Sequence, residues 1–351
     1  MKHTNKKIAF FDAKPYDRQS FDKVNRGFGF DINYFDAHLN PQTVELTYGF
    51  DAVCTFVNDT INEEVVKHLF EHNIKIVALR SAGYNNVDFK AAFGKVHVVR
   101  VPAYSPYAVA EHAAALILSL NRKIHRAYNR IRDGNFSING LLGFDMHGKT
   151  AGIIGTGKIG KCLISILKGF GMQILAYDPY PDEIYAKEIK IRYVTLDELF
   201  KKSDIISLHC PLTPETEHMI NEESIKKMKD GVMIINTGRG KLIHTSALIK
   251  MLKAGKVGSA GLDVYEEESE YFFEDFSTAV ISDDVLARLM TFPNVLVTSH
   301  QGFFTEEAIY NIAETTLENL KEFFNGGYLK NEICYKCELK ECLKKEKKRC
   351  F

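Results

Sequence analysis

The motif Gly155-Thr156-Gly157-Lys158-Ile159-Gly160 joins the apolar run from Thr150 to Ile154 to a helix-forming stretch from Lys161 to Lys168. In such a turn the first glycine permits a tight bend, the second lets the backbone approach a pyrophosphate, and the third lets the helix pack against the strand. The free N–H groups and the positive dipole end of the helix then face the phosphates. These residues predict the strand, turn and helix of a dinucleotide-binding unit.

An acidic residue at a suitable distance separates this motif from an ordinary turn between strand and helix. The run from Gln173 to Tyr177 reads as a second strand and ends in Asp178, eighteen residues after Gly160. A carboxylate at that place holds the ribose hydroxyls in nucleotide-binding folds. It would repel a ribose phosphate, and residues 179–182 offer no Arg or Lys to neutralise one. The sequence therefore predicts NAD rather than NADP.

Short β-rich runs alternate with helical stretches on both sides of the motif. In the first hundred residues the expected strands are 7–11, 32–35, 52–56, 74–79 and 96–99, with amphipathic segments such as 62–71 between them. In the second series they are 149–154, 173–177, 204–208, 232–236, 257–262 and 294–298. Strands that alternate with helices imply βαβ units and parallel sheets covered on both faces. We expect an α/β protein with two doubly wound parallel-sheet domains.

Two long helical stretches predict how the chain passes between these domains. A run from Pro106 to about Arg132 is long enough to bridge them, and a helix from about Glu306 to Phe324 follows the last strand. If this helix folds back onto the first domain, the chain crosses twice, which suits a hinge over a cleft. We expect one domain from 1–103 plus 303–332, a second from 104–302, and a tail from 333–351.

The composition restricts the kind of partner. The 351 residues contain 45 Lys plus Arg and 45 Asp plus Glu, so no net field draws the chain to nucleic acid or anionic lipid. The longest apolar run, Ala108 to Leu120, is interrupted by Glu111 and His112 and is shorter than the roughly 20 residues of a spanning helix. The N-terminal apolar stretch is too short for a secretory signal. We expect a cytoplasmic protein that acts on a small molecule, without nucleic-acid or membrane partners.

Polar side chains with complementary chemistry follow the strands of the second series. Arg239 lies after the strand 232–236, an acidic run that ends in Glu268 follows 257–262, and His300 follows 294–298. Because ligands bind beyond the carboxyl ends of parallel strands, these loops should meet beside the nucleotide. Taken singly, the residues have simpler explanations, namely a surface charge, an exposed acidic turn and a structural histidine. Their placement at successive strand ends favours a shared catalytic site.

Each of the three has a task in the exchange of a 2-hydroxy acid and a 2-keto acid. Arg239 presents a planar fork that matches a substrate carboxylate. Histidine is the side chain that changes charge near neutral pH, so His300 is suited to take the hydroxyl proton, or to return it to a keto oxygen in the opposite direction. Glu268 would bond the other ring nitrogen, orient the imidazole and raise its pKa. Positioning and proton transfer are the protein's share, because the nicotinamide carries the hydride.

Several segments together resemble the D-isomer-specific 2-hydroxyacid dehydrogenases and, within that family, the enzymes that interconvert pyruvate and D-lactate. The likeness runs from about residue 5 to residue 330. The matching segments are 155–160 (GTGKIG) with Asp178, 79–88 (LRSAGYNNVD), 101–112 (VPAYSPYAVAEH), 236–240 (NTGRG), 261–268 (GLDVYEEE) and 298–305 (TSHQGFFT). The resemblance implies a flavodoxin-like substrate domain with an inserted Rossmann NAD-binding domain. It also implies a homo-oligomer, either a homodimer or a homotetramer.

The resemblance also implies roles for individual residues. Arg239 would anchor the substrate carboxylate, Glu268 would be the partner of His300, and His300 would donate the proton. The residues implied around the substrate are Ala82 and Gly83 through their backbone N–H groups, and Phe56 and Tyr104 as pocket walls. The implied cofactor contacts are Gly155, Gly157, Lys158, Ile159 and Gly160 at the pyrophosphate, Asp178 at the ribose, Cys210, Pro211 and Thr216 beside adenine and ribose, Thr237, Gly238 and Arg239, and Asp263 near the nicotinamide amide.

Phe56 and Tyr104 bear on the choice of substrate, although both also suit a strand end and a proline turn as ordinary apolar residues. Aromatic side chains there would make a small closed pocket that favours the methyl group of pyruvate over bulky side chains. One methylene is worth only about 1 to 3 kcal/mol in an apolar pocket, so related acids are also candidate substrates. Two alternatives stay open. One is a sister dehydrogenase for glycerate, hydroxypyruvate or 2-hydroxyisocaproate, and the other is a non-catalytic NAD-sensing protein similar to the family's transcriptional corepressors.

The end of the chain departs from the family. It carries four of the seven cysteines, Cys334, Cys337, Cys342 and Cys350, whereas the others are isolated. An odd total on a chain without an export signal argues against disulfides, so we expect free thiols. Four thiolates are able to bind zinc or an iron–sulfur cluster, but spacings of two, four and seven residues match no familiar metal motif. We expect a solvated helical or frayed extension without a metal.

Overall fold

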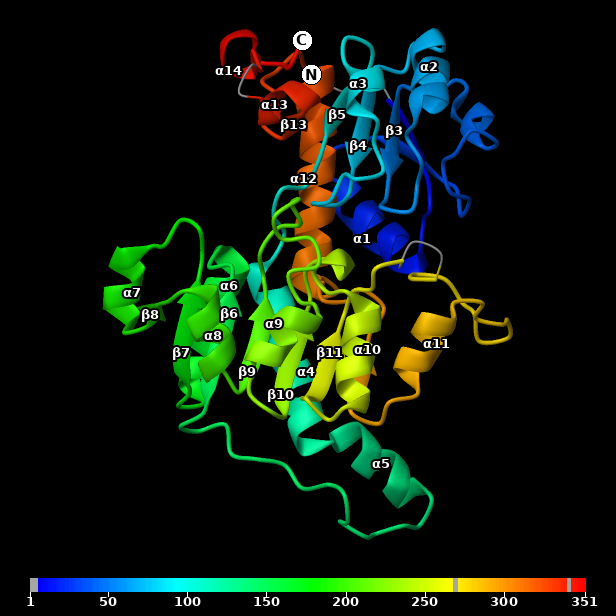
Figure 1. Cartoon of the computed structure of the whole chain (residues 1–351). Helices are drawn as coiled ribbons and strands as arrows, with labels where there is room; N and C mark the ends of the chain where they lie inside the picture. Colours follow the sequence, from blue (N-terminus) through cyan, green and yellow to red (C-terminus); the bar gives the residue numbers. More distant parts are fainter. Residues whose placement is uncertain (1–5, 268–270, 340–341) are drawn as a thin grey trace. The chain divides into compact units, whose positions relative to one another are not determined.

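The computed structural model describes residues 6–267, 271–339 and 342–351, which form two compact units (Figure 1). Unit 1 comprises Met1–Ser105 and Phe304–Phe351, and unit 2 comprises Pro106–Phe303. Each unit contains a mainly parallel sheet with helices packed on it. The expected α/β class with two doubly wound sheets is therefore confirmed. No helix in these residue ranges is long and apolar enough to cross a membrane.

Unit 1 contains a six-stranded sheet in the order β13-β5-β4-β3-β1-β2. Five of its strands are parallel and follow the order 2-1-3-4-5 of flavodoxin-like folds. They are β1 (Lys7–Phe10), β2 (Asp31–Tyr34), β3 (Ala52–Thr55), β4 (Ile76–Leu79) and β5 (His97–Val99). The sixth, β13 (Glu332–Ile333), is antiparallel to β5. The sequence did not predict β13, because two residues are too few to show a periodic pattern.

Helices cover the sheet of unit 1, which explains why its strands are continuous apolar runs. Ala9, Val53 and Val77 of the strands share one cluster with Val65 and Leu69 of α2. The helices α1 and α12 pack on each other, and α12 also contacts β4. The helices are α1 (Pro15–Asn25), η1 (Val44–Thr47), α2 (Glu63–Glu71), α3 (Phe89–Ala92) and α12 (Glu306–Phe324).

Unit 2 contains a seven-stranded parallel sheet in the order β12-β11-β10-β9-β6-β7-β8. The strands are β6 (Thr150–Ile154), β7 (Gln173–Tyr177), β8 (Arg192–Tyr193), β9 (Ile205–Leu208), β10 (Val232–Asn236), β11 (Val257–Leu262) and β12 (Val295–Val297). Counted from β6, this is the order 3-2-1-4-5-6 of a Rossmann fold with one further strand. The order reverses between β6 and β9. Ligands bind at such a switch point, beyond the carboxyl ends of the strands.

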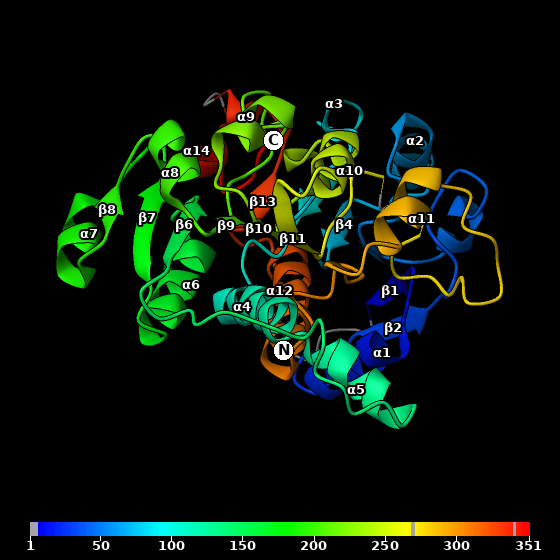
Figure 2. The same ribbon diagram turned by 60° about the horizontal axis from the view of Figure 1, so that its bottom comes forward.

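Alternate residues of the strands in unit 2 pack on opposite faces of its sheet. Ile234 of β10 joins the cluster beneath α8, α9 and α10, whereas Met233 and Ile235 join the cluster beneath α4 and α6. Figure 2 shows these two sets of helices on opposite sides of the sheet. The helices are α4 (Pro106–Arg122), α5 (Ile124–Arg132), α6 (Lys158–Gly169), α7 (Glu183–Ile189), α8 (Leu196–Lys202), α9 (Glu222–Lys227), η2 (Gly240–Leu242), α10 (Thr245–Lys253) and α11 (Asp284–Met290).

The prediction of a single helix from Pro106 to about Arg132 is wrong, because the helix is interrupted at one residue. Lys123 has a φ of +52° and separates α4 from α5. The side chain of Asn121 exchanges two hydrogen bonds of 2.8 Å with the backbone of Phe144, and Lys123 Nζ donates to the carbonyl of Leu142. The segment that contains Leu142 and Phe144 thus binds the end of α4, and α5 starts as a separate helix.

The tail packs against β5 in the sheet of unit 1, so the prediction of a solvated or frayed extension is also wrong. The helices α13 (Tyr335–Glu338) and α14 (Lys344–Lys347) follow β13, and Figure 1 draws this segment in red beside β5. Cys334 and Cys350 are 7% and 2% exposed. Phe351 stacks on His97 of β5 with ring centroids 4.3 Å apart. These contacts join residues far apart in the chain, and the local sequence pattern carries no sign of them.

Candidate functional site

The turn between β6 and α6 has the form that a pyrophosphate needs. Gly155 has a φ of +92°, and a Cβ there would lie 2.6 Å from the backbone of Cys210 in the loop after β9. A Cβ at Gly160 would overlap the carbonyl oxygen of Gly155. By contrast, a Cβ at Gly157 would meet no atom within 4 Å in the part of the chain that the structure describes. The first and third glycines are therefore needed for close packing, and the second faces open space that suits a phosphate.

Asp178 lies beside this turn at the end of β7. Its Oδ2 accepts hydrogen bonds from the backbone N–H of Thr156 at 2.8 Å and from Thr156 Oγ1 at 3.0 Å. Its Oδ1 accepts from the N–H of Tyr180 at 3.0 Å. The carboxylate is thus held against the glycine turn, as a contact with the ribose of a dinucleotide would require.

The loop after β9 lies next to the same turn. Cys210 is half-buried, and burial raises the pKa of its thiol to about 11, which keeps it neutral. Thr216 Oγ1 donates to the carbonyl of Pro211 at 2.7 Å and accepts from the N–H of Thr213 at 2.8 Å. The three residues expected beside adenine and ribose therefore share one internally bonded turn.

The loop after β10 presents Arg239, which is half-buried. Asn236 shapes this loop, because its Oδ1 accepts from the N–H of Gly238 at 3.0 Å and its Nδ2 donates to the carbonyl of Arg239 at 2.9 Å. The guanidinium donates to the carbonyl of Gly238 at 2.7 Å. A Cβ at Gly240 would overlap the carbonyl of Tyr265, so the loops after β10 and β11 are in close contact.

Two features of this edge of the sheet call for a ligand. Lys158 and Ile159 open α6, and the N-cap, Gly157, has no side chain that satisfies the first N–H groups. Thr237 Oγ1 is buried and has no hydrogen-bond partner among the residues that the structure describes. A buried hydroxyl without a hydrogen-bond partner lowers the stability of the folded state by about 1–3 kcal/mol. Together with the carboxylate of Asp178, these groups fit the pyrophosphate and ribose of a dinucleotide such as NAD.

A buried carboxylate ties the loop after β11 to the loop after β12. Asp263 is 1% exposed and accepts hydrogen bonds from Thr298 Oγ1 at 2.5 Å and from the N–H groups of Gln301 at 2.9 Å and Gly302 at 2.8 Å. Its Oδ1 also lies 3.1 Å from Nε2 of His112 in α4. Burial by itself raises the pKa of Asp263, but hydrogen bonds from His112, Thr298 and Gly302 outweigh it and hold that pKa below its usual range. Asp263 is therefore a charged anchor.

His300 takes an unusual backbone conformation on this anchor. Its φ is +50°, a region that residues other than glycine seldom enter. Its N–H donates to the carbonyl of Asp263 at 2.8 Å, and its ring lies 5.9 Å from the ring of Phe273. Such strain persists where surrounding contacts hold it, and it clusters at functional sites. The sequence pointed to His300, but it did not reveal that His112 and Thr298 position the loop through Asp263.

Backbone hydrogen bonds join the loops that carry these residues. The N–H of Asp263 donates to the carbonyl of Asn236 at 2.9 Å, and the N–H of Thr298 donates to the carbonyl of Leu262 at 2.9 Å. The loops after β10, β11 and β12 are therefore neighbours at the carboxyl edge of one sheet. An arginine, a buried carboxylate and a histidine follow successive strands there.

Glu268, the expected partner of His300, lies outside the described residues. The acid two positions earlier, Glu266, is described and takes other partners. Its carboxylate lies 2.8 Å from Nε2 of His218 and accepts from the N–H of Thr245 at 2.6 Å. Glu266 thus holds the loop after β11 against the start of α10. The pairing of Glu268 with His300 stays a prediction.

The residues expected to contact substrate in unit 1 also follow parallel strands. They are Phe56 after β3, Ala82 and Gly83 after β4, and Tyr104 in the segment between β5 and α4. The carbonyl of Ala82 accepts from the guanidinium of Arg100 at 2.7 Å, and the carbonyl of Gly83 accepts from Ser81 Oγ at 2.8 Å. The loop after β4 therefore has a defined shape at the carboxyl edge of its own sheet.

Arg80 organises that edge, and sequence reasoning did not single it out. It is 2% exposed and donates to the carbonyls of Phe11 at 3.0 Å and Asp12 at 2.5 Å, both after β1. Its guanidinium carbon lies 4.7 Å from the centroid of the Phe56 ring, and its Nε lies 3.5 Å from Asp17. Burial raises the pKa of Asp17, and Arg80 counters this only in part. Arg80 thus positions Phe56, but only its three-dimensional contacts distinguish it from a surface arginine.

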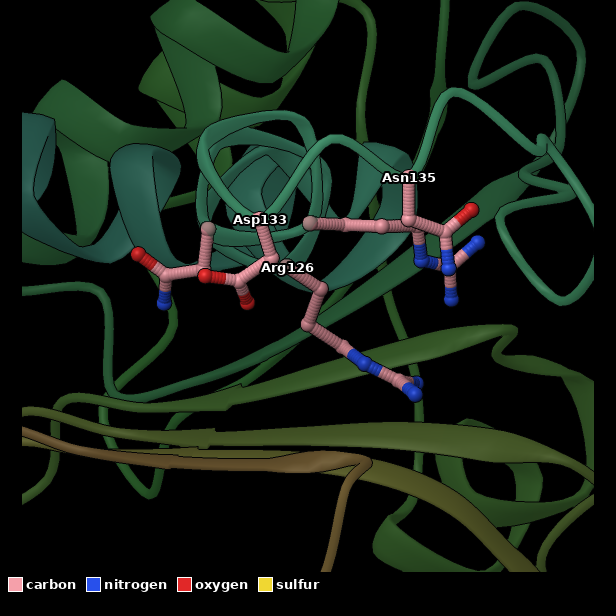
Figure 3. Close-up of a pocket in the computed structure, with 5 residues that line it drawn as sticks. Arg126, Asp133 and Asn135 are labelled. Atoms are coloured by element: carbon pink, nitrogen blue, oxygen red, sulfur yellow. The ribbon is translucent and has the colours of Figure 1, made fainter.

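A hollow of about 370 Å³ lies elsewhere in unit 2. Figure 3 shows that polar and charged side chains line it, and these come from α5 and the segment that follows it. The lining residues are Arg126, Asn129, Arg130, Asp133 and Asn135. None of them was expected in the site, and none follows a strand of the sheet.

Comparisons with known proteins place this geometry in context. Residues 114–302 match the family model described as D-isomer specific 2-hydroxyacid dehydrogenase, NAD binding domain. The chain is 53% identical to the D-lactate dehydrogenase of Escherichia coli (strain K12) over 329 residues, which are 93% of this chain and 99% of that one.

Solved structures agree with the sequence comparisons. The apo-structure of D-lactate dehydrogenase from Escherichia coli matches with a TM-score of 0.86 and 51% identity, and covers 93% of this chain and 99% of that chain. The D-lactate dehydrogenase of Lactobacillus jensenii, solved with NAD+, matches with a TM-score of 0.80 and 33% identity over 93% of this chain and 99% of that one.

Proposed function

The chain belongs to the D-isomer-specific 2-hydroxyacid dehydrogenases and is an NAD-dependent oxidoreductase, and from this premise we propose that it acts as a D-lactate dehydrogenase. The observation that carries the proposal is the carboxyl edge of the unit 2 sheet. There, Arg239, Asp263 and His300 lie in the loops after β10, β11 and β12 of the sheet that also holds a dinucleotide-binding turn. The similarity to D-lactate dehydrogenases supports this activity over a sister dehydrogenase or a non-catalytic NAD sensor.

In the proposed mechanism, three side chains handle the substrate and its proton. When bound, NADH supplies the hydride that converts pyruvate to D-lactate. Arg239 holds the pyruvate carboxylate through its bidentate fork and so orients the adjacent keto carbon. His300 donates a proton to the keto oxygen, and in the reverse direction it accepts the hydroxyl proton. Glu268 favours the protonated imidazole and fixes its orientation.

For the cofactor, we propose the contacts that the sequence suggested. Gly155, Gly157 and Gly160 shape the turn, Lys158 and Ile159 present the N–H groups of α6, and Asp178 binds the ribose. Cys210, Pro211 and Thr216 border adenine and ribose, and Thr237, Gly238, Arg239 and Asp263 lie toward the nicotinamide. The buried hydroxyl of Thr237 and the open space at Gly157 support this assignment.

For the substrate, we propose contacts in the loops of unit 1. Backbone N–H groups of Ala82 and Gly83 would bind the carboxylate, and Phe56 and Tyr104 would enclose the methyl group. Phe56 is 8% exposed and its ring centroid lies 4.7 Å from the guanidinium carbon of Arg80, and this packing supports its proposed role as a pocket wall. This proposal assigns residues 1–103 plus 303–332 to substrate and 104–302 to NAD.

The decisive experiment follows the loss of NADH absorbance on addition of a panel of 2-keto acids. The panel contains pyruvate, hydroxypyruvate, glyoxylate and 2-ketoisocaproate, and chiral analysis of the product establishes its configuration. We expect the highest kcat/KM with pyruvate and D-lactate as the product. A higher kcat/KM with another acid would assign the sister activity, and absence of turnover with all four would favour an NAD sensor.

We also propose that the enzyme is a homo-oligomer, either a homodimer or a homotetramer. The helix α5 has no buried residue among those the structure describes, although it carries large apolar side chains. The exposed apolar residues of α5 and the following segment are Ile124, Tyr128, Ile131, Phe136, Ile138 and Leu142, all more than half exposed. Apolar surface gathered in this way marks a contact with another protein. We further propose that the enzyme works in the cytoplasm, where its free cysteines stay reduced.

A further inference from the structure

The four cysteines of the tail converge on one point. Cys334 Sγ lies 3.7 Å from Cys337 Sγ and 3.9 Å from Cys342 Sγ. Cys350 Sγ lies 3.9 Å from Cys337 Sγ and 3.4 Å from Cys342 Sγ. All four sulfur atoms lie within 4.8 Å of one another. Four thiols spread over the last part of the chain thus form one compact set.

These distances suit a shared metal ion better than disulfides or a cluster. A disulfide needs about 2.05 Å between sulfurs, and all four cysteines are free. Tetrahedral zinc with Zn–S bonds of about 2.3 Å places its four sulfurs about 3.8 Å apart. An iron–sulfur cluster inserts several iron and sulfide atoms between the thiolates, so it needs them farther apart. The observed spacing leaves room for a single ion.

We propose that Cys334, Cys337, Cys342 and Cys350 bind one zinc ion in a tetrahedral four-thiolate site. Cys334 and Cys337 have the two-residue spacing that is common in structural zinc sites. The second pair is unusual, because seven residues separate its members. The sequence spacing therefore argued against a metal, whereas the folded tail brings the two pairs together. This inference does not depend on the proposed enzymatic activity.

The surroundings of the sulfurs also fit a metal site. The backbone N–H of Lys336 donates to the sulfur of Cys334, and the N–H of Lys344 donates to the sulfur of Cys342. Hydrogen bonds from backbone N–H groups orient the sulfur ligands of a metal ion. Basic residues outnumber acidic ones by seven to four between residues 331 and 351. That excess offsets the charge of four thiolates around a divalent ion.

Glu332 links this site to the sheet of unit 1. It is fully buried, and its Oε2 accepts from the N–H of Cys350 at 2.6 Å. Its Oε1 lies 2.5 Å from Nδ1 of His97 on β5. Lys344 Nζ donates to the carbonyls of Glu332 at 2.7 Å and Lys330 at 3.1 Å. A zinc ion at the four sulfurs would therefore fasten β13 and the end of the chain to the edge of the sheet.

The proposed ion is structural rather than catalytic. Four protein thiolates complete a tetrahedral shell, so no position stays open for water or substrate. A segment this short buries too little apolar surface to fold firmly alone, and small folds of that kind commonly rely on a metal. Zinc would supply the stabilisation that a small apolar core cannot.

The test begins with full-length, untagged protein purified with a reductant and without added metal. Elemental analysis by mass spectrometry should find one zinc per chain. The double variant Cys337→Ser/Cys342→Ser changes the two half-exposed ligands and should lose the zinc. The matched control Cys162→Ser removes a half-buried thiol of α6 in unit 2 and should keep one equivalent. A zinc chelator should lower the Tm of the wild type and leave that of the double variant unchanged.

A second measurement keeps the inference open to refutation if the double variant fails to fold. Wild-type protein is exchanged with Co²⁺, and its absorption spectrum is recorded. We expect sulfur-to-cobalt charge-transfer bands and the intense visible bands of tetrahedral cobalt. Iron in place of zinc, less than half an equivalent of any metal, or an octahedral cobalt spectrum would each overturn the assignment. A disulfide between any two of the four cysteines in the reduced preparation would do the same.

Discussion

Asp263 shows how one buried charge organises the proposed catalytic edge. Its carboxylate receives four donors and its carbonyl holds His300 in a left-handed conformation. Because the folded-state pKa of Asp263 is lowered, its contribution is present above the unfolded-state pKa and is lost only as pH falls through the folded-state value. The loop of His300 should therefore stay ordered across the neutral range.

His300→Gln should depress kcat by about 10²- to 10⁴-fold, the usual contribution of a positioned proton donor. Glutamine preserves size and polarity but does not transfer a proton. Titration of intrinsic or NADH fluorescence should show an unchanged Kd for NADH, because the change does not reach the glycine turn. Steady-state kinetics with pyruvate provide the measurement. Near-normal turnover in this variant would remove His300 from the proton-transfer role.

Asp178→Ala should relax the preference for NADH over NADPH. The carboxylate is held against the turn by Thr156, so a ribose phosphate would meet a fixed negative charge. Removing it should raise the ratio of kcat/KM with NADPH to kcat/KM with NADH by about tenfold or more. Parallel assays with the two coenzymes measure this ratio. If the ratio does not change, Asp178 does not contact the ribose.

The strand, turn and helix formed by β6 and α6 place three glycines with different tasks close together. Gly160 is needed because helix and turn are in contact, whereas Gly157 is not needed by the protein's own packing. This contrast separates the requirements of folding from those of binding. It also explains why a short motif predicts both the fold and the ligand, since the requirements of folding and of binding apply to the same few residues.

Gly157→Ala should weaken NADH binding without unfolding the protein. The added methyl group enters the open space that the pyrophosphate would fill, and overpacking of about 1–3 kcal/mol corresponds to about a 5- to 150-fold increase in Kd. The Tm should stay within a few degrees of the wild type. The matched variant Gly160→Ala should instead lower the Tm, because its methyl group overlaps the carbonyl of Gly155. Equal NADH affinity in Gly157→Ala and the wild type would contradict the proposed path of the pyrophosphate.

The chain as a whole is divided so that unit 1 contains both of its ends and unit 2 is a continuous insertion. In each unit, the loops at the carboxyl ends of the parallel strands carry residues that we propose for the site. Within unit 2, α5 and the segment after it carry apolar residues that the unit's own cores do not bury. A second copy of the chain is the partner that we propose for this surface.

Ile131→Asp combined with Tyr128→Asp should therefore disrupt assembly. Light scattering coupled to size-exclusion chromatography should give at least twice the chain mass of 39.8 kDa for the wild type and a lower mass for the variant. Ile184→Asp on α7 serves as the control, because this side chain is 82% exposed but lies on another helix. A wild type of 39.8 kDa, or a double variant that assembles normally, would refute the proposed interface.

Much of the molecule could be read from local patterns along the chain. Short apolar runs predicted the strands of both sheets except the two-residue strands β8 and β13, and the glycine motif with Asp178 predicted the nucleotide-binding unit. These features are encoded locally, because a strand needs only its own alternation or apolar run and a turn needs only its own glycines. Arg239 and His300 could be found for a related reason, since parallel strands bring their carboxyl ends to one edge whatever the loops contain.

Other features depend on contacts between distant residues, and no local pattern contains them. Arg80 against Phe56, His112 on Asp263, and Glu332 between Cys350 and β5 are examples. The cysteine tail is the clearest case, because its spacing argued against a metal and its folding places four sulfurs around one point. Sequence spacing measures distance along the chain, whereas a binding site depends on distance through space, and only packing of the chain relates the two.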